Sequence, residues 1–138
     1  MLDTSVLTSA MRSPDGASGI LVRAVLNGLF RPLISVPLIL EYESVLTRPE
    51  HLVASGFTRR EAVRIVKAFC KMGEPVDIEF RLRPLSRDPN EEFVLETAFH
   101  GKAEMIVTFN IKDFKHAVAS FGIETVLPSE ALMRMRKL

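Results

Sequence analysis

The ten residues from Met105 to Phe114 read Met-Ile-Val-Thr-Phe-Asn-Ile-Lys-Asp-Phe, and they predict the class of fold. The apolar run from Met105 to Thr108 predicts a short buried β-strand. A polar loop follows it, and the residues from Asp113 to Ala119 predict a short helix. A buried strand followed by a loop and a helix is the repeating unit of α/β proteins.

The alternation of helix and strand continues on both sides of this stretch. Upstream, Asp88 and Pro89 predict the start of a helix that runs to about His100, where Gly101 is a typical C-terminal stop. Downstream, residues 124–127 predict another strand and residues 129–136 predict a terminal helix. The second half of the chain is therefore expected to alternate regularly.

The first half of the chain shows a similar order of elements. Residues 1–3 and 33–35 predict strands, and residues 75–80 predict an extended, irregular segment. A Gly- and Pro-bearing polar stretch covers residues 13–19. The predicted helices run from about Ile20 to Gly28, from Pro37 to about Thr47 with Pro49 as the stop, and from the capping box Thr58–Glu61 to about Lys71.

This order predicts an α/β fold with a mostly parallel sheet that is covered by helices on both faces. At 138 residues, with 47% hydrophobic and 25% charged residues, the chain is expected to form a single domain over residues 1–138. The predicted helix from Thr58 to about Lys71 carries an apolar face formed by Ala62, Ile65, Val66, Phe69 and Cys70. We therefore expect Cys70 to lie in the core.

The composition gives limited information about cellular location and about nucleic-acid binding. Cys70 is the only cysteine, no targeting segment is recognisable, and the apolar stretches are too short to cross a bilayer, which favours a reducing cytoplasm and no membrane association. A net charge of +1 neither indicates nor excludes nucleic-acid binding. A protein with an acidic pocket surrounded by basic residues would also have a net charge near zero.

Several polar side chains follow predicted strands. Asp3 follows the first strand, and Thr108, Asn110 and Asp113 follow the strand that begins at Met105. In open α/β sheets, ligands bind beside the carboxyl ends of the strands, so these two loops are expected to meet at one crevice. An alternative for Asp3 is local turn chemistry, in which it bonds to nearby backbone amides.

Two helices carry a carboxylate on or beside an apolar face. Glu41 lies at the edge of the stripe of its helix, whereas Glu43 projects away from it. Glu91 falls within a stripe at i, i+3, i+4 and i+7, and Glu92 and Glu96 are expected to point elsewhere. An inward carboxylate is costly unless it is paired, protonated or bound to metal. The alternatives are a boundary position for Glu41 and a capping box with Asp88 for Glu91.

Four segments resemble the motifs of PIN domains, in order and in context, and most closely those of the toxin (VapC-like) branch of toxin–antitoxin pairs. The segments are Met1-Leu2-Asp3-Thr4-Ser5-Val6-Leu7, Glu41-Tyr42-Glu43-Ser44-Val45-Leu46, Asp88-Pro89-Asn90-Glu91-Glu92-Phe93 and Ile106-Val107-Thr108-Phe109-Asn110-Ile111-Lys112-Asp113-Phe114. The likeness extends over nearly the whole chain, through residues 127–132. Ser5 stands where asparagine is commonest in the family, and Glu91 stands where aspartate is usual.

The resemblance implies a three-layer α/β/α fold and a ribonuclease that uses Mg²⁺ or Mn²⁺ to hydrolyse RNA phosphodiesters. Its catalytic residues would be Asp3, Glu41, Glu91 and Asp113, and the metal ligands among them would be Asp3, Glu91 and Asp113. Ser5, Thr108 and Asn110 would orient carboxylates or metal-bound water. The implied partners are RNA and a small antitoxin protein, with a homodimer as a further form of assembly.

Basic residues near these motifs are candidates for a rim that grips phosphates. Arg12, Arg87 and Lys112 are the main candidates for substrate binding, and the others are Arg48, Arg81, Arg83 and Lys115. The simpler interpretation of each is an ordinary solvated charge.

Three other functions are compatible with parts of the pattern. A non-catalytic PIN-like protein would keep contact with RNA or antitoxin but would not cleave. A phosphoacceptor signalling domain would carry paired acids after the first strand, and Asp3 has no acidic neighbour. A haloacid-dehalogenase-like phosphatase would carry an aspartate where Ser5 stands.

Overall fold

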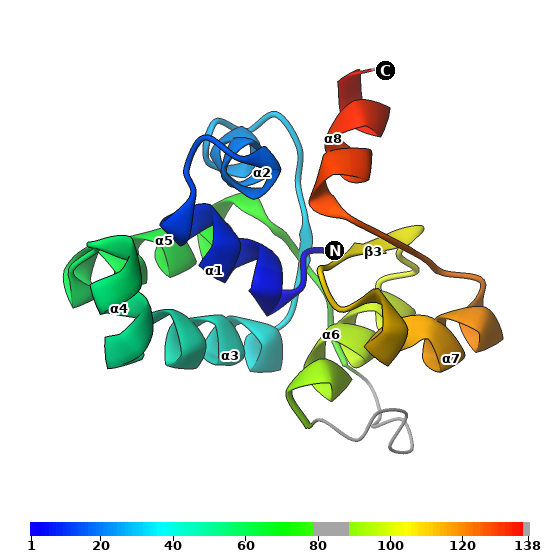
Figure 1. Cartoon of the computed structure of the whole chain (residues 1–138). Coiled ribbons are helices and arrows are strands. Elements are labelled where there is room, and N and C mark those ends of the chain that lie inside the picture. The colour runs from blue at the N-terminus through cyan, green and yellow to red at the C-terminus, as the bar shows by residue number, and fades with distance from the viewer. Residues whose placement is uncertain (79–88, 137–138) are drawn as a thin grey trace.

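The computed structural model describes residues 1–78 and 89–136 (Figure 1). Its helices are α1 (Thr4–Arg12), α2 (Ala17–Leu26), α3 (Val36–Leu46), α4 (Pro49–Ser55), α5 (Arg59–Met72), α6 (Pro89–His100), α7 (Ile111–Phe121) and α8 (Pro128–Arg136). Its strands are β1 (Leu33–Ile34), β2 (Glu74–Pro75), β3 (Met105–Val107) and β4 (Glu124–Val126).

Every strand pairing in the described residues is parallel. β1 pairs with β2, β3 pairs with β4, and Leu2 forms an isolated parallel bridge with Val107. The predicted α/β class with parallel pairing is therefore confirmed. The predicted strand at residues 1–3 is reduced to the single bridge at Leu2, because α1 begins at Thr4.

The predicted helix starts are well explained by capping. Ser35 precedes α3 and its side chain accepts a hydrogen bond from the Leu38 amide at 3.4 Å, while Pro37 occupies the first turn. The capping box before α5 is confirmed, with Thr58 and Glu61 exchanging two side-chain to backbone bonds of 3.1 Å each. These contacts fix where the two helices begin.

Two helices were not predicted. α1 buries Val6, Leu7, Ala10 and Met11, and this apolar face was obscured by the Ser and Thr residues between them. Pro49 was interpreted as the stop of the preceding helix, but it also opens α4, since proline fits the first turn of a helix. Gly56 ends α4 with a positive φ of 76°, a conformation that glycine adopts readily.

One cluster of buried apolar residues extends through α1, α2, α3, α5, α6, β3, α7, β4 and α8. The N-terminal residues run between α1–α5 and α6–α8 (Figure 1). Contacts of α3 with α6 and of α2 with α8 join the two groups of helices. Tyr42 of α3 and Phe69 of α5 are fully buried and pack edge to face, with their ring centroids 5.9 Å apart. No helix in the described ranges is both long enough and apolar enough to span a membrane.

The predicted position of Cys70 was wrong. Cys70 is exposed, while Ala62, Val66 and Phe69 form the buried face of α5. Each residue of an α-helix turns by about 100°, which carries Cys70 beyond the edge of that face. Ile65, at the other edge, is half-buried.

Candidate functional site

The backbone brings the ends of two parallel strands together at Asp3 and Thr108. The Asp3 amide donates to the Val107 carbonyl at 2.9 Å, and the Val107 amide donates to the Met1 carbonyl at 2.9 Å. The Thr108 amide donates to the Val126 carbonyl of β4 at 3.0 Å. Asp3 and Thr108 therefore leave neighbouring strands at the same end, where ligands bind in parallel sheets.

The carboxylate of Asp3 is held by two hydroxyl groups. Its Oδ2 atom accepts a hydrogen bond from Ser5 Oγ at 2.7 Å and another from Thr108 Oγ1 at 2.7 Å. Asp3 is 6% exposed and Thr108 is fully buried. Asp3 occupies the N-cap position of α1, yet its side chain makes no capping bond to the helix. Both bonds come from hydroxyl groups and not from nearby backbone amides, so the local-turn alternative accounts for neither.

Each hydroxyl group is itself oriented by a backbone amide. Ser5 Oγ accepts from the Phe109 amide at 3.3 Å, and Thr108 Oγ1 accepts from the Asn110 amide at 2.9 Å. Because an amide points at each hydroxyl oxygen, the hydroxyl proton is free to point at Asp3. The loop after β3 thus fixes the orientation of the Asp3 carboxylate through both hydroxyl groups.

The second carboxylate oxygen of Asp3 is open. Within the described residues, Oδ1 accepts no hydrogen bond. The only fully enclosed side-chain polar atom without a partner there is Ser18 Oγ, so Oδ1 is not fully enclosed. Asp3 therefore presents one fixed oxygen and one oxygen with lone pairs available to a ligand.

Tyr42 anchors the backbone next to Asp3. Its hydroxyl group donates to the Leu2 carbonyl, and its side chain is wholly buried. Burial, and secondly the charge of Asp3, raise the pKa of Tyr42 well above its ordinary value. Tyr42 is thus a neutral donor that positions the Asp3 segment. From the sequence we predicted only a core role for it, and its place directly after Glu41 was the available signal.

Glu41 and Glu91 are both buried, each with 9% of its surface exposed, on helices α3 and α6 that pack against each other. Glu91 lies with Val94, Leu95 and Ala98 on the buried face of α6, as its helical spacing predicts. Glu43 is half-buried. The Asp88 partner of the capping-box alternative for Glu91 lies outside the described residues.

Glu96 was predicted to point away from the apolar stripe of α6, and this was wrong. Glu96 is also 9% exposed, and the neighbouring Thr97 is fully buried. The hydroxyl groups of Thr97 and Ser35 lie 2.5 Å apart, which ties α6 to the N-cap of α3. The buried surface of α6 is therefore wider than one stripe, since it includes Glu96 and also Thr97, which contacts the start of α3.

Asp113 and Asn110 are exposed in the loop and first turn of α7, where the Asp113 amide donates to the Asn110 carbonyl at 3.1 Å. Over residues 1–78 and 89–136, no three Asp, Glu, His or Cys side chains form a group that could hold a metal ion. The structure therefore joins Asp3 with Ser5 and Thr108 directly. It does not bring Asp113 and Glu91 together with Asp3 as a three-ligand group.

The donor chemistry nevertheless fits a hard divalent cation. Every predicted ligand is a carboxylate, the class of oxygen donor that Mg²⁺ and Mn²⁺ prefer. Asp3 Oδ1 belongs to an oriented carboxylate, and no hydrogen bond to it is seen among the described residues. A magnesium ion keeps several waters and binds through one or two carboxylates, so Asp3 and one further acid would suffice.

The predicted basic rim is only partly described. Arg12 is exposed at the C-terminal end of α1, the end away from Ser5, and its guanidinium lies 2.7 Å from His51 Nδ1. Burial, followed by the charge of Arg12, lowers the pKa of His51. Lys112 is exposed beside Asp113, and Arg48 and Lys115 are also exposed. The predictions for Arg81, Arg83 and Arg87 fall outside the described residues.

Comparison with known proteins gives one match. No curated protein and no solved structure matches the chain. A family model described as PIN domain matches residues 1–112, a span that includes Asp3, Glu41, Glu91 and Thr108 and ends one residue before Asp113. PIN domains are generally nucleases and typically use divalent metal ions. Because the match covers most of the sequence and includes the loops that meet at Asp3, the chain belongs to the PIN-domain family.

Proposed function

We propose that this protein is a divalent-metal-dependent endoribonuclease whose site is organised around Asp3. The observation that carries the proposal is the state of the Asp3 carboxylate, with Oδ2 fixed by Ser5 and Thr108 and Oδ1 open. A carboxylate so prepared, at the ends of parallel strands in a PIN-family chain, suits metal binding.

Asp3 and one further predicted ligand, Glu91 or Asp113, would hold the ion, and Mg²⁺ or Mn²⁺ would fit these oxygen donors. When bound, the ion would lower the pKa of a water molecule and stabilise charge on the attacked phosphate. Ser5 and Thr108 keep the Asp3 carboxylate in one orientation, so little reorganisation is needed when a ligand arrives.

Glu41 would act as a proton acceptor near the reacting phosphate, since a buried carboxylate on α3 lies one residue from Tyr42, which anchors Leu2. In the overall reaction, a water oxygen bonds to phosphorus and the bond from phosphorus to the leaving sugar oxygen breaks. The water loses one proton and the leaving oxygen gains one.

The same proposal includes the arrangement of the sheet and the biological role of the protein. The short parallel pairs would form one central sheet within a three-layer α/β/α arrangement. The protein would act on cytoplasmic RNA as the toxin of a toxin–antitoxin pair. The parallel pairings support the sheet and the PIN-family match supports action on RNA, while the toxin role rests on the resemblance of the four motifs to the toxin branch.

A non-catalytic PIN-like binding protein is the second candidate. The exposed position of Asp113 and the absence of a three-ligand group in the described residues favour it. Such a protein would bind RNA or an antitoxin at the same loops. Cleavage assays separate the two candidates.

The test combines cleavage with a binding readout. Purified protein and the Asp3→Asn variant are incubated with structured and unstructured RNAs in Mn²⁺, Mg²⁺ or EDTA. Asp3→Asn should abolish metal-dependent cleavage and leave the fold intact, because an amide oxygen can still accept from Ser5 and Thr108.

The same samples are melted with and without the ion. A divalent ion that binds only the folded protein adds about 2.7 kcal/mol at 100 times its Kd, and the resulting rise in Tm should be smaller in Asp3→Asn. Cleavage by Asp3→Asn at the parent rate would refute the site. Absence of cleavage by the parent with every divalent ion would favour the binding protein.

A further inference from the structure

A second charged surface lies on α5. Arg60, Arg64, Lys67 and Lys71 recur at i, i+4, i+7 and i+11, so they share one side of the helix, and all four are exposed. At 1.5 Å of rise per residue, they extend over about 16 Å of the helix axis. We call these four residues the basic face of α5.

The basic face points away from the site at Asp3. The opposite side of α5 is formed by Ala62, Val66 and Phe69, which are buried, and Phe69 packs against Tyr42. Tyr42 in turn bonds to the Leu2 carbonyl beside Asp3. A ligand on the basic face would therefore lie outside the loops that carry the candidate nuclease site.

Within the described structure the four cations of the basic face form no ion pair, although the charge of Arg64 attracts Glu61 three residues before it. The ion pairs among the described residues involve Arg23 and Arg134 only. The nearest acid, Glu61, is engaged with Thr58 in the capping box.

Part of this arrangement works against the stability of α5. Like charges at i and i+4, as in Arg60 with Arg64 and Lys67 with Lys71, repel each other. Arg60, in the first turn, also opposes the helix dipole, whereas Lys71 in the last turn is favoured by it. A solvated helix face more often mixes the two signs of charge. A bound polyanion would relieve the repulsion.

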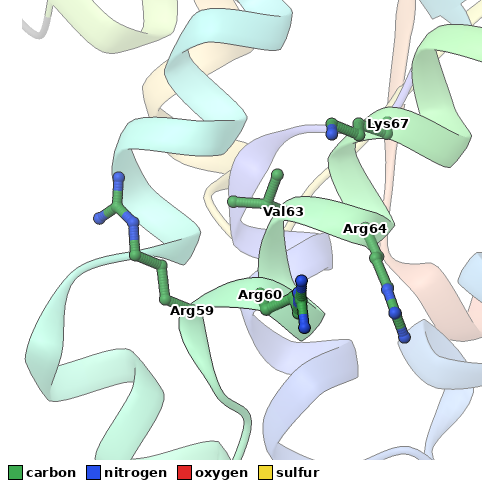
Figure 2. Close-up of a pocket in the computed structure, with 5 residues that line it drawn as sticks. All are labelled: Arg59, Arg60, Val63, Arg64 and Lys67. Carbon is green, nitrogen blue, oxygen red and sulfur yellow. The ribbon is translucent and has the colours of Figure 1, made fainter.

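The surface has a shape suited to an extended chain of phosphates. Arg59, Arg60, Val63, Arg64 and Lys67 line an open depression of about 440 Å³. Figure 2 shows Arg59 and Arg64 on either side of Val63. None of the described residues that line the depression is aromatic, so they offer no platform for stacking bases. Its chemistry suits phosphates, because guanidinium groups grip phosphate through paired hydrogen bonds.

We propose that the basic face of α5 is an anchoring surface for the phosphodiester backbone of RNA, independent of base sequence and separate from the Asp3 site. RNA as the polyanion rests on the proposed function. An RNA held on both surfaces would bind more tightly than on either, because the first contact raises the effective concentration at the second.

The first test measures binding of a fluorescent single-stranded RNA in EDTA, so that cleavage does not interfere. The variant Arg60→Gln/Arg64→Gln/Lys67→Gln is compared with Arg23→Gln/Lys102→Gln/Arg136→Gln, which removes the same charge from exposed sites elsewhere. Each phosphate contact with a single strand contributes about 0.7 to the slope of log affinity against log salt. The α5 variant should lose about 2 from that slope, and its affinity at low salt should fall at least about tenfold.

The second test uses Cys70, the only cysteine, which is exposed on α5 beside Lys71. RNA should slow alkylation of Cys70 by a maleimide, both in the parent and in Asp3→Asn. Equal loss of RNA binding in the two triple variants, or unchanged alkylation of Cys70 at saturating RNA, would overturn the proposal. Stronger protection by polyglutamate than by RNA would instead assign the face to an acidic protein partner.

These outcomes are distinct from those of the cleavage assay. Protection of Cys70 and loss of salt dependence in the α5 variant support the anchoring surface even if no divalent ion supports cleavage. Cleavage with unaltered binding by the α5 variant supports the nuclease and refutes the anchoring surface.

Discussion

Thr108 Oγ1 donates a hydrogen bond of 2.7 Å to Asp3 Oδ2 across 105 positions of the sequence. The contact is possible because Leu2 and Val107 form a parallel bridge, which aligns the residues that follow each of them. A fully buried hydroxyl group at Thr108 is thus committed to orienting one carboxylate.

Replacing Thr108 by Val should therefore damage the site, although the two side chains have nearly the same size. Valine keeps the shape but removes the donor, which should cost about 1 kcal/mol of unfolding free energy. RNA cleavage should fall about 10- to 100-fold, as is common when a residue that orients a metal ligand is lost. Thr125→Val is the control, because Thr125 makes no side-chain hydrogen bond in the described structure. Denaturant unfolding and initial cleavage rates measure both effects, and similar rates in the two variants would contradict the role of Thr108.

The parts of this site that the sequence predicted correctly came from helical and strand periodicity. The burial of Glu91 followed from its spacing with Val94, Leu95 and Ala98, and the meeting of Asp3 and Thr108 followed from their positions after parallel strands. The spacing alone failed at Cys70, which lies just outside the buried arc of α5.

Other features depended on tertiary contacts that a single sequence does not reveal. Glu96 is buried although it lies off the apolar stripe of α6, a helix that packs against both α3 and α7. Pro49 could end one helix or begin another, and only the structure distinguishes the two. The catalytic role of Glu41 and the metal-binding roles of Asp3, Glu91 and Asp113 stay predictions.

Glu41 and Glu43 offer a matched pair for testing the site on α3. Glu41 is buried at 9% exposure, whereas Glu43 is half-buried, two residues away on the same helix. Glu41→Gln should lower cleavage about 100-fold or more if its carboxylate accepts a proton in the reaction. Glu43→Gln makes the same chemical change and should have little effect. Equal losses of cleavage from both substitutions would show that the orientation assigned to α3 is wrong.

Tyr42 should make stability depend on alkaline pH. Its pKa in the folded protein is raised above 10, so the unfolded chain releases the phenol proton at a lower pH than the folded protein does. The contribution of Tyr42 is complete below about pH 10 and is lost as the pH rises above that value.

Tyr42→Phe should be less stable than the parent at pH 8 by about 1 kcal/mol, because the bond to the Leu2 carbonyl is lost. Above pH 10 the difference should shrink by about 1.4 kcal/mol per pH unit. Denaturant unfolding at pH 8 and above pH 10 gives the comparison. The chain has one Tyr and no Trp, so phenolate absorbance reports this group alone. A difference between the two proteins that stays constant with pH would contradict the raised pKa.

The toxin hypothesis predicts the effect of expressing the protein in cells. A ribonuclease that is active in the cytoplasm would damage the RNA of its own host, so its gene should require an inhibitor that binds the acidic loops around Asp3. A cationic tail of such an inhibitor would be attracted to the carboxylates and would compete with the metal ion. Expression of the chain alone should slow growth, expression of Asp3→Asn should not, and co-expression of the short reading frame encoded beside it should restore growth. Harmless expression of a chain that cleaves RNA when purified would refute the toxin role and leave the nuclease. Growth inhibition that persists in Asp3→Asn would show instead that toxicity does not arise from cleavage at this site.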